Sequence, residues 1–187
     1  MKTADEIFVL SRGISQFAPK TIHTSYKVFI DHFQRSLSDQ LILSGAYMVY
    51  GWMPTMLRLK GSVDSVYKAA YAAREGRLNP EIIDACSATL NNSLVGTTKL
   101  IHFIAPTLYP IWDSRVYRAL YGKRPHPYRV EDSITYMRYL DWVCDFEEQS
   151  QFLDLRLRFE EEAGYSVSSK RVADAVLYAL GPKPSKG

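Results

Sequence analysis

The sequence contains almost no cysteine. Cys86 and Cys144 are the two cysteines among 187 residues. Two thiols are too few for a disulfide framework, for a zinc site built from cysteines, or for an iron–sulfur cluster with four cysteine ligands. Metal–thiolate chemistry is therefore excluded, and we expect neither a metal site nor an organic cofactor.

Long apolar runs and strand patterns are also missing. The longest uncharged apolar stretch, residues 45–53, is far shorter than the ~20 residues that cross a bilayer. The first residues, MKTADEIF, include acids where a signal peptide would be apolar. No two alternating β-branched runs are joined by a hairpin turn. We therefore expect a cytoplasmic protein that is not associated with a membrane, and we expect no β-sheet.

Helical patterning is present instead along nearly the whole chain. Apolar residues recur at three- and four-residue intervals, and residues that commonly cap helix N-termini precede several of these segments. The predicted N-caps include Thr24, Ser38, Asn79 and Asp113. A polar turn at residues 91–93 is expected to join two helices as a tight hairpin, with the second helix beginning at Thr97.

The length and the helical pattern together predict an all-α fold. A chain of 187 residues is typical of one compact domain. We expect residues 1–181 to form one monomeric domain with two lobes, and residues 182–187 to be a disordered tail.

Acidic residues are nearly absent from one long segment. The net charge is only +3, but between residues 85 and 130 the single acid is Asp113. The basic residues of this segment are Lys99, Arg115, Arg118, Lys123, Arg124 and Arg129. Residues 141–162 are by contrast rich in Asp and Glu. A basic face of this kind suits a phosphate backbone, and a solvated surface that happens to be basic is the alternative interpretation.

The most informative window is residues 94–121, LVGTTKLIHFIAPTLYPIWDSRVYRALY. It contains a hairpin, an apolar helix, a proline-bearing loop, and an aspartate at the start of a basic helix. This order resembles the helix-hairpin-helix DNA glycosylases, the superfamily that includes glycosylases acting on 8-oxoguanine, adenine mismatches and alkylated bases.

The resemblance implies a function and a set of site residues. It implies a DNA-binding cleft for double-stranded DNA, with the hairpin at Gly96, Thr97 and Thr98 holding a phosphate through backbone N–H groups. It places Asp113 on the aspartate that assists base excision. It places Lys99 near the lysine that attacks the sugar in the members that are also lyases.

The chemistry of Asp113 supports the same role without the family. Breaking a base–sugar bond develops positive charge on the deoxyribose, which a fixed carboxylate beside the sugar stabilises. An aspartate at a helix N-terminus, beside basic residues, is held in its ionised form. The same carboxylate could orient or deprotonate the attacking water. The alternative is that Asp113 is only a helix cap.

Lys99 is predicted to lie in the first turn of an apolar helix. Both the helix dipole and partial burial there lower the pKa of an amine, as a Schiff-base nucleophile requires. Contact with a DNA phosphate, or exposure to solvent, are the alternatives. His102 follows one turn later on the same face, where it could line a pocket or be a hydrogen-bonded core residue.

A base taken out of a duplex is held between aromatic or apolar side chains. The candidates for such a base pocket are Tyr47, Tyr50, Trp52, His102 and Trp112. Aromatic residues at this spacing also suit a core. The candidate phosphate contacts are Arg58, Lys60, Arg115, Arg118, Lys123 and Arg124, with a solvated face as the alternative.

The leading hypothesis is therefore a DNA glycosylase that flips out and excises a modified or damaged base and leaves an abasic site, with Lys99 as a candidate for an added lyase step. The resembled group includes repair enzymes and anti-phage enzymes that excise hypermodified cytosines such as glucosylated hydroxymethylcytosine. The hairpin with the single glycine Gly96, and the small size, favour the defence role. The alternatives are a non-catalytic helical DNA-binding module that uses residues 115–129, and a helical protein-interaction protein that uses residues 141–162.

Overall fold

The fold is all-α, as the periodicity predicts. A computed structural model describes residues 1–34, 36–122 and 130–182. The helices of the described residues are α1 (Ala4–Ser11), α2 (Lys20–Phe33), α3 (Asp39–Trp52), α4 (Asp64–Arg74), α5 (Pro80–Thr89), α6 (Leu94–Ile104), α7 (Ser114–Tyr121), α9 (Ser133–Glu147), α10 (Phe152–Ala163) and α11 (Ser169–Leu180). Within these ranges no strand forms, and one isolated bridge pairs Leu59 with Leu90.

Most of the predicted helix starts are confirmed by their hydrogen bonds. The side chains of Ser38, Asn79 and Asp113 each accept a backbone N–H from the first turn of α3, α5 and α7. The predicted cap at Thr24 is wrong, because α2 begins earlier, after Pro19. The predicted start at Thr97 is also wrong. Ser93 caps α6, which begins at Leu94, and this moves Lys99 from the first turn into the second.

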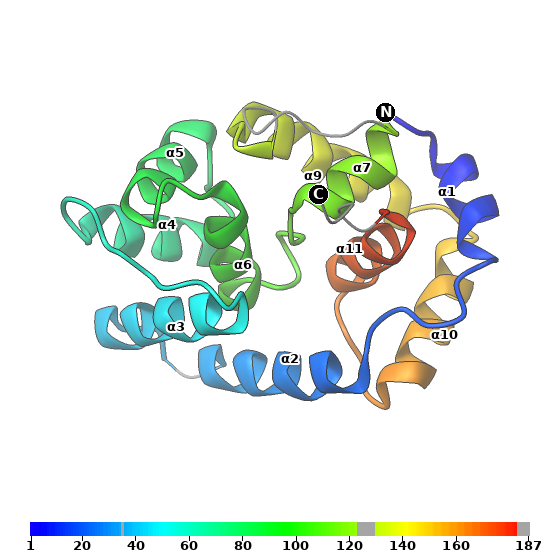
Figure 1. Cartoon of the computed structure of the whole chain (residues 1–187), viewed down its shortest axis with the longest axis horizontal. Helices are drawn as coiled ribbons and strands as arrows, with labels where there is room; N and C mark the ends of the chain where they lie inside the picture. The colour runs from blue at the N-terminus through cyan, green and yellow to red at the C-terminus, as the bar shows by residue number, and fades with distance from the viewer. Residues whose placement is uncertain (35, 123–129, 183–187) are drawn as a thin grey trace.

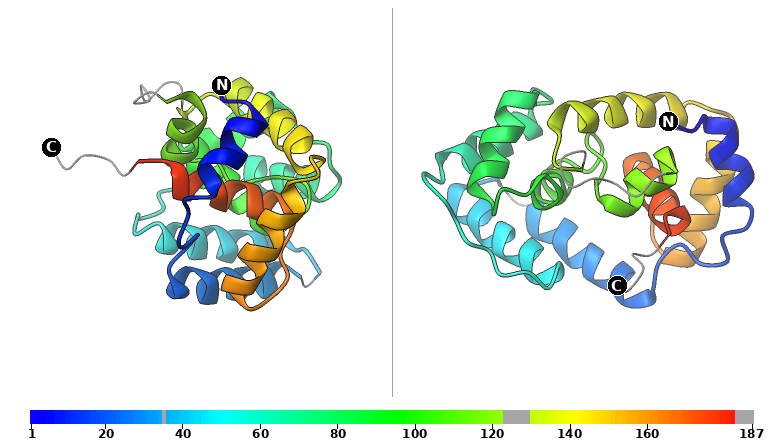
Figure 2. Two further views of the ribbon diagram at one scale, coloured as in Figure 1. Left: turned by 90° about the vertical axis from the view of Figure 1, so that its right-hand side faces the viewer. Right: turned by 45° about the horizontal axis from the view of Figure 1, so that its top comes forward.

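The helices pack in two groups. Helices α2 to α6 pack on one another, and α11 packs against α7, α9, α1 and α10. Figure 1 shows the two groups side by side, with α2 along the lower edge, and Figure 2 shows α9 along another side of the molecule. Contacts between α5 and α9 join the groups. Among the described residues, none of the helices combines the length and apolarity that crossing a membrane requires.

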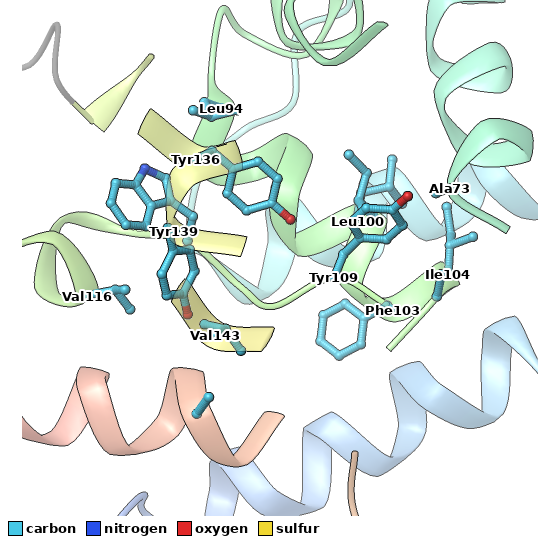
Figure 3. Packing of buried hydrophobic residues seen from close by; sticks show 14 of the residues in the cluster. Ala73, Leu94, Leu100, Phe103, Ile104, Tyr109, Val116, Tyr136, Tyr139 and Val143 are labelled. Atoms are coloured by element: carbon cyan, nitrogen blue, oxygen red, sulfur yellow. The ribbon is translucent and has the colours of Figure 1, made fainter. Parts of the chain in front are cut away.

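The core is continuous and rich in aromatic side chains. Tyr136 and Tyr139 of α9 are fully buried, as is Phe103 of α6. Figure 3 shows these rings packed with Leu100 and Tyr109 in the interior. Because α6 is covered by α2, α3, α4 and α5, almost every side of this helix faces other residues rather than solvent.

Gly96 allows α6 to approach α3. An added Cβ at Gly96 would overlap the phenol of Tyr50, including the Cε2 carbon at 2.9 Å. The Tyr50 hydroxyl cannot move away freely, since it donates a 2.7 Å hydrogen bond to the carbonyl oxygen of Leu90 at the end of α5. Gly96 is therefore required by packing between two helices.

Because of this close contact, we expect alanine substitutions at two helical glycines to change the stability of the protein in opposite directions. We expect Gly96→Ala to lower the free energy of unfolding by ~1–3 kcal/mol, because the added methyl overpacks the core. Gly51→Ala in α3 is the matched control, because a Cβ there meets no atom within 4 Å. It is expected to stabilise the protein by up to ~1 kcal/mol through helix propensity. Equal effects in urea denaturation would contradict the packing role of Gly96.

Candidate active site

A cavity of about 660 Å³ lies where the two groups of helices meet. Its walls come from the end of α3, the middle of α6, the start of α7, one face of α11, and the first turn of α2 with the segment before it. The lining residues are Gln16, Phe17, Ala18, Pro19, Ile22, Trp52, Met53, Pro54, Lys99, Ile111, Asp113, Arg115, Val116, Arg171, Asp174, Ala175, Tyr178 and Ala179. The cavity volume falls within the ~300–1,000 Å³ that is usual for small-molecule sites.

Asp113 is both a helix cap and a residue of this cavity. Its Oδ1 atom accepts the backbone N–H of Arg115 at 2.7 Å and that of Val116 at 3.1 Å. Both capping bonds use the same oxygen, so capping does not require Oδ2. The two interpretations of Asp113 from sequence are therefore compatible with one another.

Lys99 reaches the same cavity from α6. Burial lowers the pKa of its amine, and the carboxylates of Asp113 and Asp174 act in the opposite direction. The Nζ atom lies 5.7 Å from the centroid of the Trp52 ring. A half-buried lysine with a lowered pKa, next to an aromatic wall, has the properties of an amine nucleophile.

Two further charged residues of the cavity were missed from sequence. Arg171 and Asp174 lie one turn apart on α11 and form an ion pair, although both residues are buried. Asp174 Oδ2 also accepts the N–H of Ile111 at 3.2 Å, two residues before Asp113. Burial raises the pKa of the Asp174 carboxyl group, and Arg171 partly offsets this effect. The sequence signal that could have identified this ion pair is two opposite charges three residues apart in the otherwise mostly apolar segment RVADAVLYAL.

The segment before α2 forms another wall and is held by a carboxylate from α10. Glu162 accepts the backbone N–H of Phe17 at 2.8 Å and of Ala18 at 2.9 Å. Its Oε1 atom also lies 3.0 Å from His23 Nε2. This network fixes the Phe17 side of the cavity to the C-terminal half of the chain.

The predicted base pocket is corrected at most of its positions. Trp52 lines the cavity, whereas Tyr47 is an exposed residue of α3 that does not line it. Tyr50, His102 and Trp112 are buried in the core, where none of them can receive a ligand in this structure. All three belong to helices or loops that other parts of the chain cover on several sides. The helical periodicity of apolar residues does not distinguish a residue in such an interior from one that lines a cavity.

Hydrogen bonds explain why these polar aromatic residues are buried. His102 Nδ1 lies 2.7 Å from the carbonyl oxygen of Tyr109, and its Nε2 atom lies 2.8 Å from the hydroxyl of Tyr26. Trp112 Nε1 donates to the carbonyl oxygen of Val130 at 2.8 Å. The core interpretation of His102 is therefore confirmed. Burial lowers the pKa of this imidazole to about 3, which keeps it neutral.

The predicted phosphate contact at the α5–α6 hairpin is also corrected. Gly96, Thr97 and Thr98 are buried, with the Thr97 hydroxyl bonded to Ser87 and that of Thr98 near the backbone of Trp112. The carboxylate of Glu131 accepts the N–H groups of Leu94 and Val95 at the start of α6. The helix N-terminus that would attract a phosphate is thus occupied by a carboxylate of the same chain.

The predicted basic contacts lie in two places. Arg58 and Lys60 are exposed on the segment between α3 and α4, which pairs with the hairpin through Asn91 and Thr89. The Arg115 guanidinium lies 4.0 Å from the centroid of the Tyr178 ring at the cavity. Arg118 donates to the carbonyl oxygen of Pro182. Lys123 and Arg124 lie outside the described residues.

Comparisons with known proteins add no assignment: no family model, no curated protein and no solved structure matches this chain. In the part of the chain that the structure describes, no three His, Cys, Asp or Glu residues gather into a potential metal site. The residues of the cavity therefore provide the basis for inferring a function.

The Glu131 contact generates a test of the DNA binding that the sequence predicts. We expect Glu131→Ala to lower the Kd for duplex DNA by about two- to fivefold, because it frees the N-terminus of α6 for a phosphate. Loss of the hydrogen bond from the N–H of Leu94 should also reduce stability by ~0.5–1.5 kcal/mol. The control is Glu148→Ala, which removes the same charge from an exposed position at the end of α9. Equal changes in fluorescence-anisotropy titrations of the two variants would contradict an anion site at the hairpin.

Proposed function

We propose that this protein is a DNA glycosylase that excises a base from double-stranded DNA at the cavity of Lys99 and Asp113. The observation that supports this proposal best is that a half-buried amine and a carboxylate, from two successive helices, open on one cavity with an aromatic wall. Arg171 and Asp174 extend the polar part of the same cavity.

The proposed chemistry uses these groups in distinct roles. As the bond between C1′ and the base nitrogen breaks, its electron pair leaves with the base and positive charge builds on the sugar. Asp113 stabilises this charge through its carboxylate. Either water or the neutral amine of Lys99 then forms the new bond to C1′. In the second case, opening of the sugar gives a Schiff base, from which β-elimination breaks the C3′–O bond.

The surroundings of the cavity support a flipped base as its ligand. The cavity is large enough for a small organic ligand, and Trp52 supplies an aromatic surface for stacking. The indole Nε1–H of Trp52 is buried and bonds to no acceptor in the described part of the chain.

The proposal includes a cleft for the duplex between the two groups of helices. The α5–α6 hairpin would lie beside the DNA as a helix-hairpin-helix element, with Arg58, Lys60, Arg115 and Arg118 facing phosphates. The small size of the chain and the hairpin with one glycine favour one form of this proposal. In that form, the protein is a cytoplasmic monomer that removes hypermodified cytosine from phage DNA.

Base release from a panel of DNAs tests the proposed function. The panel contains genomic DNA with modified cytosines and duplexes with oxidised, alkylated or deaminated bases, and abasic sites are scored before and after alkali. We expect wild-type protein to release one class of base. Asp113→Asn should lower the rate by ~10²-fold or more, because the transition-state charge is left uncompensated.

The variant is suited to this test because asparagine caps helices as well as aspartate does. DNA binding and thermal stability should therefore be retained. Asp154→Asn, at an exposed acid of α10, is the matched control and should keep full activity. Unchanged base release by Asp113→Asn would remove Asp113 from the mechanism. DNA retention without base release from any substrate would support the non-catalytic DNA-binding module instead.

A further inference from the structure

The cavity holds two carboxylates in very different surroundings. Asp113 is half-buried and accepts two backbone N–H groups at the start of α7. Asp174 is only 2% exposed, in the middle of α11, where its partners are Arg171 and the N–H of Ile111. When the surroundings of two carboxyl groups give them different pKa values, one of them commonly acts as the acid and the other as the base.

The proposed attack by Lys99 requires a proton acceptor. The ammonium group must lose a proton before its nitrogen can bond to C1′. Among the described lining residues, the carboxylates that could take this proton are Asp113 and Asp174. Asp113 is needed as a carboxylate beside the positively charged sugar, and a proton on it would remove that stabilisation. A proton on Asp174 weakens its ion pair with Arg171 but leaves the Asp113 carboxylate ionised beside the sugar.

Burial brings the proton affinities of Lys99 and Asp174 closer together. In water a lysine and an aspartate differ by about 6.5 pKa units, which makes proton transfer between them strongly unfavourable. In this cavity, burial lowers the pKa of Lys99 and raises that of Asp174 to about 7. Each group also responds to the charge of Asp113, consistent with their shared position in the cavity.

We propose that Asp174 accepts the proton that Lys99 releases when its amine attacks C1′, and returns that proton to the leaving group. The inference rests on the proposed function, since it requires Lys99 to be the nucleophile. The balance is complete: the amine nitrogen forms the bond to C1′, the leaving group takes the electron pair of the bond that breaks, and the proton passes from Lys99 through Asp174 to the leaving group.

Arg171 is the positioning residue for this carboxylate. It pairs with Asp174 Oδ1, and its guanidinium lies 4.7 Å from the centroid of the Tyr26 ring of α2. The pair therefore fixes the Asp174 side chain between two elements. Its positive charge also favours release of the proton after Asp174 has accepted it.

Covalent trapping on a duplex with a single abasic site tests this inference without knowledge of the excised base. Borohydride reduces a Schiff base to a stable protein–DNA complex, and the initial trapping rate is measured from pH 5.5 to 10. We expect wild-type protein to form the complex at neutral pH and Lys99→Met to form none. In Asp174→Asn, trapping at pH 7 should fall at least tenfold and recover as the pH rises.

A purely electrostatic role for Asp174 predicts the opposite pH shift, and a purely structural role predicts loss of trapping at every pH. The Asp174 carboxylate raises the pKa of Lys99, so its removal alone would lower that pKa. The free amine would then form at lower pH, and trapping at neutral pH would be unchanged or faster. Either result would overturn the inference.

A second variant controls for folding, because an asparagine at 174 leaves the buried Arg171 without its counter-ion. Arg171→Met/Asp174→Asn removes both charges and should show the same loss at neutral pH and the same recovery in alkali. Asp174→Glu retains a carboxylate and should trap at neutral pH.

Failure of this inference is distinguishable from failure of the proposed function. Base release by wild-type protein without covalent trapping at any pH would overturn the inference alone, because water would then be the nucleophile. Trapping by wild-type protein with a profile unchanged in both Asp174 variants would also overturn only the inference. Absence of both base release and trapping would overturn the two together.

Discussion

The buried ion pair between Arg171 and Asp174 is the interaction on which the cavity depends. An unpaired charge in the interior costs ~3–5 kcal/mol, so each of these residues requires the other. Asp174 also binds the N–H of Ile111, in the loop that leads to Asp113. Arg171 packs over the ring of Tyr26 in α2. One turn of α11 thus fixes the entry to α7 and at the same time contacts the other group of helices.

At the start of α6, a carboxylate of the same chain occupies the position where an external anion would bind. A helix N-terminus attracts anions, and Glu131 supplies a carboxylate to the N–H groups of Leu94 and Val95. The backbone N–H groups of Arg58 and Lys60 bond to residues of this hairpin, and both residues are exposed. In the proposed complex, Arg58 and Lys60 rather than the N-terminus of α6 would therefore contact phosphates at this hairpin.

Local signals predicted much of the secondary structure and part of the site. Ser38, Asn79 and Asp113 were identifiable as caps because a cap bonds within its own first turn. Lys99 and Asp113 are close in sequence and reach one cavity because a single loop joins α6 to α7. Helix caps and contacts between residues that are close in sequence depend on few neighbouring residues, so the sequence of one chain is enough to identify them.

Burial and long-range pairing could not be predicted in the same way. Tyr50, His102 and Trp112 have the composition of a ligand pocket, but they are core residues because other helices cover them. Arg171 and Asp174 lie about sixty residues beyond Asp113 in sequence, so their position beside it depends on how α11 packs against α7. These outcomes follow from tertiary packing, which the helical period does not specify.

The proposed function requires that a nucleotide sugar binds in the cavity of Lys99 and Asp113. Peptide mapping of the borohydride-reduced complex with an abasic-site duplex can show this, because mass spectrometry identifies the residue to which the DNA is attached. We expect attachment at Lys99, with protection of the Trp52 peptide from oxidation in the complex. Attachment spread over exposed lysines such as Lys27 and Lys68, with Lys99 unmodified, would contradict it.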